Sequence, residues 1–317
     1  MNLLEISAKN TLNCFKLKSG EDILIICDKN TSKIANIIYN EALQMDFDPV
    51  LTYMEPRRFD GEEPPREIAH AMLFSDVIIA PTFKSLTHTT ARRNATKNGA
   101  RIATLPGITP DVFARTMRLD YYSIKDSTLN LTKMLSRASL AQVISPSGTN
   151  LLFQLGHKAQ ADTGILKDYG SYSNLPAGES SVAPIERSAN GVIVVDRCGE
   201  IITKPTKILI KNGFIDSIEN TPSGIKFKSI LDEVNKIDNS KNAFNLAEFG
   251  MGTNPLAKIT GCVLEDEKVL GTCHFAFGDN TSFDGGTVDS TIHMDVIVNK
   301  ITLKLDNKFI MKEGKLI

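Results

Sequence analysis

The chain has 317 residues, of which 42% are hydrophobic and 23% charged, and 36 Lys and Arg against 37 Asp and Glu give a net charge of −1. This length allows two domains and a large core, and the balanced charge gives no electrostatic reason to expect nucleic acid or an anionic membrane as a partner. No apolar run approaches the roughly 18–20 residues of a membrane span. The N-terminal residues lack the basic and apolar regions of a signal peptide, so we expect a cytoplasmic protein.

The first part of the chain alternates between β-branched runs and segments with helical spacing. Strands are expected at 21–28, 49–55, 77–82 and 101–107, with helices over 31–46, 64–76 and 85–100 between them. This alternation predicts a parallel, Rossmann-like or flavodoxin-like sheet. No GxGxxG follows the first strand, so a nucleotide site is not expected there.

After a helix predicted over 121–140, the pattern changes to short β-branched runs separated by turn signals. Strands are expected at 149–155, 191–196, 200–213, 269–277 and 290–305. We therefore predict an α/β domain over 1–145 and a mainly β domain over 146–317. The five cysteines show no CxxC spacing, which argues against a disulfide framework or a cysteine-based zinc site.

Acids and histidines cluster in four short segments of the second half. Glu179 lies in "NLPAGESSVAP", Glu248 in "NLAEFGMGTNP", His274 in "GTCHFAFG", and His293 and Asp295 in "STIHMD". Carboxylates in apolar surroundings are costly without a partner or a cation. His293 and Asp295 are two residues apart, so a strand would point both to one face. They form either a hydrogen-bonded structural pair or part of a metal site.

Two histidines and three carboxylates can build a two-metal centre. In such a centre one carboxylate bridges the ions and a metal-bound water becomes the nucleophile, and zinc, cobalt or manganese accepts this mixed nitrogen and oxygen ligand set. Taken singly, each motif also fits an ordinary surface glutamate or a structural histidine. Their occurrence together in one domain favours a metal site.

Taken together, these motifs resemble those of the aminopeptidase T family of metallo-aminopeptidases, which includes staphylococcal AmpS. The resemblance is clear over 170–300 and looser in the N-terminal part, and the chain is a shorter, divergent member. It implies an α/β N-terminal domain, a C-terminal domain with two metal ions, and a homodimer. It also implies a set of metal ligands: Glu179, Glu248 as the bridge, His274, His293 and Asp295. Glu267 is either a further acidic ligand or a solvated turn charge.

One position departs from that family. The aminopeptidases carry an active-site tyrosine seven residues after the strand histidine, where this chain has Thr281, which we expect to be a substrate-binding residue. Relatives of the same fold include a dihydroxypyridine ring-cleaving dioxygenase with a single non-haem iron. His274, His293 and Asp295 alone would form the two-histidine, one-carboxylate triad of non-haem Fe(II) oxygenases. The same cluster therefore allows two reaction classes.

The main prediction is a metal-dependent hydrolase, an aminopeptidase or small-amide hydrolase with two Zn, Co or Mn ions per chain and Glu179 or Glu248 as the base. The alternatives are a mononuclear Fe(II) ring-cleaving dioxygenase and an inactive metal-binding relative. The expected partner is a small peptide or another small molecule. His88 could bind substrate or carry a proton, and Arg92 could bind a substrate carboxylate, although both also fit ordinary residues of a helix start.

Overall fold

The computed structural model describes residues 2–317, which divide into two compact units. The first unit comprises residues 1–125 and 162–177, and the second comprises residues 126–161 and 178–317. The segment 162–177 therefore groups with the first unit, although it follows residue 145. The domain boundary expected at that residue stays a prediction.

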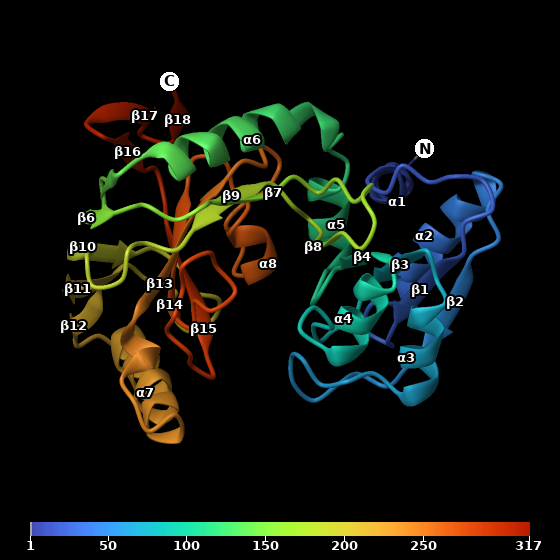
Figure 1. Ribbon diagram of the computed structural model, residues 1–317, viewed down its shortest axis with the longest axis horizontal. Coiled ribbons are helices and arrows are strands. Elements are labelled where there is room, and N and C mark those ends of the chain that lie inside the picture. Colours follow the sequence, from blue (N-terminus) through green and yellow to red (C-terminus); the bar gives the residue numbers. More distant parts are fainter. Residues whose placement is uncertain (1) are drawn as a thin grey trace. The chain divides into compact units, whose positions relative to one another are not determined.

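A five-stranded parallel sheet with the strand order β2-β1-β3-β4-β8 forms the first unit (Figure 1). Its elements are α1 (Leu3–Asn13), β1 (Ile23–Cys27), α2 (Ser32–Gln44), β2 (Val50–Tyr53), α3 (Arg66–Leu73), β3 (Val77–Ala80), α4 (Thr90–Lys97), β4 (Arg101–Thr104), α5 (Pro110–Thr116) and β8 (Tyr172–Asn174). The parallel sheet predicted from strand–helix alternation is confirmed. The fifth strand, β8, was not predicted.

Helices cover the parallel sheet because its central strands are apolar on both faces. Helix α1 contacts α2 and α5, and α3 contacts α4. Leu24, Ile78 and Ile102 share a buried cluster with residues of α3 and α4. Thr31 directly precedes α2, but its Oγ1 donates a 2.6 Å hydrogen bond to the carbonyl of Pro81 and does not cap the helix. This bond ties the start of α2 to the end of β3.

Two further sheets build the second unit, with orders β12-β11-β10-β6-β5-β16-β17-β18 and β15-β14-β13-β9-β7. Their strands are β5 (Leu140–Ile144), β6 (Asn150–Gln154), β7 (Gln160–Asp162), β9 (Glu179–Val182), β10 (Asn190–Val195), β11 (Thr206–Lys211), β12 (Phe214–Ile218), β13 (Leu246–Gly252), β14 (Cys273–Gly278), β15 (His293–Val298), β16 (Thr302–Leu305), β17 (Lys308–Lys312) and β18 (Lys315–Leu316). The helices are α6 (Tyr122–Arg137), which begins in the first unit, α7 (Pro222–Ile237), α8 (Val263–Asp266) and a 3-10 turn at Asn242–Phe244. The mainly β character predicted for this half is confirmed.

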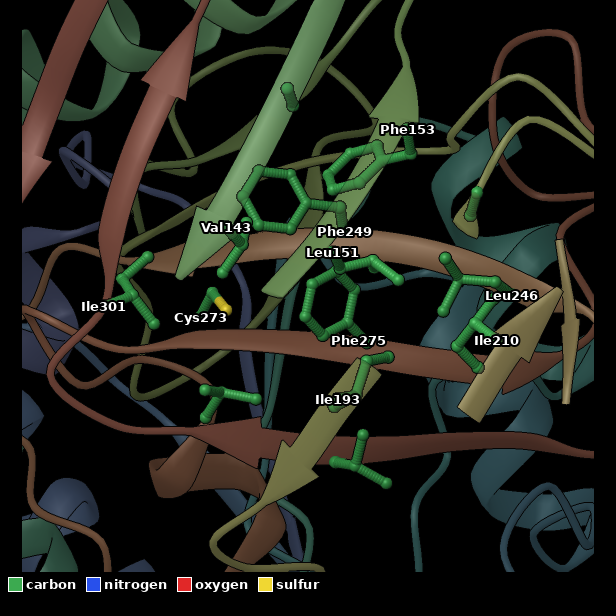
Figure 2. Close-up of a cluster of buried hydrophobic side chains, with 14 of the residues drawn as sticks. Val143, Leu151, Phe153, Ile193, Ile210, Leu246, Phe249, Cys273, Phe275 and Ile301 are labelled. Carbon is green, nitrogen blue, oxygen red and sulfur yellow. The ribbon is translucent and has the colours of Figure 1, made fainter. Parts of the chain in front are cut away.

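The main core of the second unit lies between these two sheets. Figure 2 shows Phe153 of β6 against Phe249 of β13 and Phe275 of β14. The ring centroid of Phe153 is 5.1 Å from that of Phe249 and 6.0 Å from that of Phe275, in edge-to-face geometries that aromatic pairs favour. Cys273 is also fully buried in this core.

Two turns show how local sequence shapes this unit. Asn212 and Gly213 have positive φ values of 50° and 74° and join β11 to β12, as the Asn-Gly signal predicts. The run 290–305, expected as one strand, is instead divided into β15 and β16, which belong to different sheets. Lys300, with a φ of 50°, turns the chain between them.

Residues 2–317 contain no helix with the length and hydrophobicity of a membrane span.

Candidate metal centre

Four neighbouring strands of the third sheet carry the five predicted metal-binding side chains. Glu179 begins β9, Glu248 lies in β13, His274 in β14, and His293 and Asp295 in β15. Residues two apart in a strand share a face. In β13 and β14, the residues that alternate with Glu248 and His274 pack in the core. The candidate ligands therefore project from the opposite face of the same strands.

The carboxylate of Glu248 lies between two imidazoles. Its Oε1 is 3.3 Å from Nε2 of His274, and its Oε2 is 2.9 Å from Nε2 of His293. Nε2 of His293 is also 3.8 Å from Oδ1 of Asp295. Glu248, His274 and Asp295 each offer one ligand atom within 4.8 Å of the others, a spacing that one metal ion could occupy.

Gly250 makes room for the His274 ring. The two residues are directly opposite in the β13–β14 pair. A Cβ at residue 250 would lie 2.1 Å from Nε2 of His274, so any side chain there would displace the imidazole. Glycine at this position therefore allows the ring to lie across the neighbouring strand and reach Glu248.

The orientation of His293 is set by the connection between β14 and β15. Its Nδ1–H donates a 2.7 Å hydrogen bond to the carbonyl of Asp279, and the ring of Phe283 stacks on the imidazole at 6.1 Å between centroids. A neutral imidazole that donates through Nδ1 carries its lone pair on Nε2. Once Nε2 has lost its proton, that lone pair is directed at the ligand cluster, and a backbone carbonyl bound to the other ring nitrogen is the usual support of a metal-binding histidine.

The donor set fits a divalent metal ion. Neutral imidazole nitrogens and carboxylate oxygens facing one another repel unless a proton or a cation lies between them. His274 is fully buried, and among residues 2–317 its Nδ1 has no hydrogen-bond partner. The cluster is therefore incomplete as a purely structural hydrogen-bond network. His274, His293, Asp295 and Glu248 together supply the ligand types that iron, zinc, cobalt and manganese accept.

Without a metal, protons take the place of the cation. Burial lowers the pKa of His274, but the hydrogen bond to Glu248 and the nearby carboxylates raise it to about 9. Burial likewise lowers the pKa of His293, and Glu248 together with Asp295 raises it to about 10. Burial raises the pKa of Glu248, but its contacts with the two imidazoles outweigh this effect and hold the pKa below its usual range. The metal-free site thus holds two imidazolium protons at neutral pH.

A lysine that sequence reasoning missed borders this cluster. Lys268 is only 2% exposed, and its Nζ is 2.8 Å from Oε2 of Glu179 and 3.1 Å from Oε2 of Glu267. Burial raises the pKa of Glu267 to about 8, against the lowering effect of Lys268. Glu267 is thus a largely buried partner of Lys268 rather than a solvated turn charge. The signal available in the sequence was a lysine within "EDEK", next to the strand that carries His274.

His88 and Arg92 belong to the first unit. His88 is exposed in the turn before α4. Arg92 is buried in α4, where its Nε donates a 2.6 Å hydrogen bond to the carbonyl of Thr87 and its guanidinium lies 3.8 Å from the ring centre of Tyr172. These contacts already engage the Arg92 side chain. The substrate-binding roles expected for His88 and Arg92 stay predictions.

Thr281 lies in the connection that also carries Asp279 and Phe283. It is exposed, and its Oγ1 donates to the Asp279 carboxylate, with 3.0 Å to each oxygen. Its side chain therefore stabilises the start of this connection. The role in substrate binding expected from its alignment with the aminopeptidase tyrosine stays a prediction.

Comparisons with known proteins identify a matching family and similar solved structures. The family model described as 2,5-dihydroxypyridine 5,6-dioxygenase matches residues 4–317. The solved structure of 2,5-dihydroxypyridine dioxygenase from Pseudomonas putida KT2440 is similar with a TM-score of 0.80 at 18% identity, covering 99% of this chain and 96% of that chain. Wild-type AmpT from Thermus thermophilus is similar with a TM-score of 0.71 at 15% identity, covering 99% of each chain. No curated protein matches the sequence.

These findings change the balance between the two predicted reaction classes. The similarity to AmpT supports the expected fold, a mixed α/β protein with several sheets. The family match favours the ring-cleaving dioxygenase, which the sequence left as an alternative, over the metallo-aminopeptidase that was its main prediction. The physical reason for the error is that both classes can use the same histidines and carboxylates, so the motifs alone do not separate them.

Proposed function

The chain belongs to the 2,5-dihydroxypyridine 5,6-dioxygenase family, and from this premise we propose that it is a mononuclear non-haem Fe(II) dioxygenase that opens a dihydroxylated pyridine-type ring. The observation that supports the proposal is the cluster of two imidazoles and two carboxylates on one face of β13, β14 and β15. This cluster contains the two-histidine, one-carboxylate set that non-haem Fe(II) oxygenases use.

In this proposal, His274, His293 and Asp295 hold the iron. The Nδ1–H bond from His293 to the Asp279 carbonyl keeps its Nε2 available as a ligand. When bound, the ferrous ion supplies the redox centre for the reaction of dioxygen with the ring. The protein's contribution is to fix the ligands on rigid strands, which limits the positions that the ion can adopt.

Glu248 has a separate role in this scheme. Its side chain is only 7% exposed and touches both histidines. A carboxylate at this position can accept a proton from a ring hydroxyl, which makes the oxygen a better electron donor and metal ligand. We assign Glu248 this proton-accepting role, either as an added metal ligand or directly beside the ligand set.

The test is anaerobic loading with Fe(II), followed by addition of dioxygen and 2,5-dihydroxypyridine as the probe. We expect one dioxygen consumed for each ring opened, with both labelled atoms of isotopic dioxygen in the product. Replacing Asp295 with Asn should reduce kcat by at least about 100-fold, because ligand geometry controls the reactive centre. Asp216→Asn, the same exchange at an exposed position of β12, is the matched control and should leave kcat unchanged.

Two other outcomes would contradict the proposal. Release of an amino acid from a leucine anilide by the Zn- or Co-loaded chain, without dioxygen uptake on the iron-loaded chain, would establish the hydrolase. Metal binding without turnover of either substrate class would identify a metal-binding protein that has lost catalysis.

A further inference from the structure

Lys268 is a buried cation beside the candidate metal-binding cluster, and backbone contacts fix its place in the chain. Its backbone N–H donates to the carbonyl of Glu265 at 3.0 Å, and its own carbonyl accepts from the N–H of Asn254 at 2.9 Å. Gly252 allows this close approach, since a Cβ there would lie 2.5 Å from the carbonyl carbon of Lys268. The lysine is therefore held between the end of β13 and the segment after α8.

The ammonium shares a carboxylate oxygen with a predicted metal ligand. Oε2 of Glu179 is 2.8 Å from Nζ of Lys268 and 3.7 Å from Nε2 of His274. On its other side, Nζ is 3.1 Å from Oε2 of Glu267. Glu179 and Glu267 thus both contact the ammonium. The Glu179 carboxylate lies between this ammonium and His274, which belongs to the cluster with Glu248 and Asp295.

A two-metal centre would need this same space. Its ions lie about 3.5–4 Å apart and share a bridging carboxylate. The extra carboxylates available for a second ion are Glu179 and Glu267, and both already contact the ammonium. A second dication within ion-pair distance of this ammonium would be repelled, and it would have to displace a side chain that is only 2% exposed.

We infer that Lys268 takes the place of the second metal ion, so that the centre holds one divalent ion and one fixed ammonium. The inference rests on the proposed function insofar as it takes His274, His293 and Asp295 as the metal site. It goes further because it proposes that Lys268, which is not itself a metal ligand, limits the number of bound ions to one. Lys268 acts here as a positioning residue, whose single positive charge lies between the carboxyl groups of Glu179 and Glu267 and holds both in place.

The test counts metal ions and does not depend on turnover. The purified chain is titrated with Co(II), and bound metal is measured by elemental analysis after removal of free ion, with the cobalt spectrum recorded in parallel. We expect one ion per chain in the wild type. Lys268→Met removes the charge at similar length and leaves Glu179 and Glu267 facing an open position, so we expect two ions per chain and a magnetically coupled pair.

Two controls isolate the charge. Lys268→Arg keeps the positive charge and should bind one ion. The double variant Lys268→Met with Glu267→Gln removes one of the freed carboxylates and should return the count to one. If Lys268→Met does not fold, as judged by circular dichroism, Lys268→Gln keeps a hydrogen-bond donor without the charge and should show the same second ion.

The outcomes separate this inference from the proposed function. Two ions in the wild type would overturn the inference, as would one ion in a folded, uncharged Lys268 variant. Failure to cleave 2,5-dihydroxypyridine with Fe(II) would overturn the proposed function alone, because the Co(II) count would be unaffected. A wild type that binds one ion and a Lys268→Met variant that binds two would support the inference regardless of the substrate.

Discussion

The two faces of strand β14 carry opposite kinds of chemistry within six residues. Cys273, Phe275 and Phe277 point into the core between the sheets. His274 projects from the other face, toward the other candidate metal ligands. All six residues are buried, so solvent exposure does not distinguish the faces. The two faces differ in the contacts that their side chains make. The aromatic rings on one face pack against other rings, whereas the imidazole on the other face contacts a carboxylate and needs a proton or a cation between them.

The largest expected effect of a single change is on the core face. Phe275→Ala removes a fully buried ring that packs on Phe153 and Phe249. We expect the free energy of unfolding to fall by about 3–5 kcal/mol, measured by urea denaturation of the metal-free chain. A loss below about 1 kcal/mol would show that this core tolerates the cavity, and that the two faces differ less than the structure indicates.

A change on the ligand face should act mainly on metal affinity. His274→Ala removes one of two imidazoles from the cluster, so we expect metal affinity to fall by more than about 100-fold, since even supporting contacts of ligands contribute 10–100-fold. The metal-free chain should also lose stability, because the change removes one of the two buried imidazoles that face the Glu248 carboxylate; metal affinity, and not stability, therefore separates the two faces. Calorimetric titration of both variants with Co(II) tests this, and an equal loss of metal affinity in His274→Ala and Phe275→Ala would contradict the comparison.

Metal affinity should also depend steeply on pH. The pKa values of His274 and His293 are about 9 and about 10 in the metal-free site, so both imidazoles are protonated at pH 7. Metal binding must displace these protons, so affinity should rise with pH by up to about tenfold per proton and pH unit, and then level off above these pKa values. Calorimetry in two buffers with different ionisation enthalpies should show close to two protons released per ion at pH 7. Release of none would mean that the imidazoles are neutral without metal.

A smaller effect is expected from the glycine that accommodates the His274 ring. Gly250→Ala places a Cβ against that imidazole and should weaken metal binding by roughly tenfold, the lower end of the range for ligand-supporting contacts. Gly156→Ala is the matched control, because its Cβ would meet only the flexible side chain of Ile185, at 3.1 Å. Equal metal affinities in the two variants would show that the His274 ring can shift without loss of binding.

Much of this arrangement was predictable from sequence because it depends on local periodicity. The parallel strands β1 to β4 follow from apolar runs alternating with helical segments, and the opposite directions of Cys273 and His274 follow from strand alternation. Strand β8 was not predictable, since Tyr172–Asn174 is short and polar and is defined by backbone pairing with β4.

The charged surroundings of the site were harder to predict. Lys268 has an ordinary appearance in "EDEK", and its importance comes from Glu179, a residue that is close only in the folded chain. Reaction class was also beyond the motifs, because His274, His293 and Asp295 serve either water activation or dioxygen chemistry. Family membership, not the ligand pattern, separated these two.

The β14–β15 hairpin has a consequence for the dynamics of the protein. It carries His274, His293 and Asp295, and the connection that closes it holds His293 through the Asp279 carbonyl and the Phe283 ring. With the proposed ligand set, a bound ion would join both strands and their connection. Amide hydrogen exchange in residues 279–292 should slow when the ion binds and accelerate when a chelator removes it. Under the proposed ligand set, release of the ion would then be coupled to local opening of this hairpin, so the lifetime of the loaded state would depend on the contacts that hold His293.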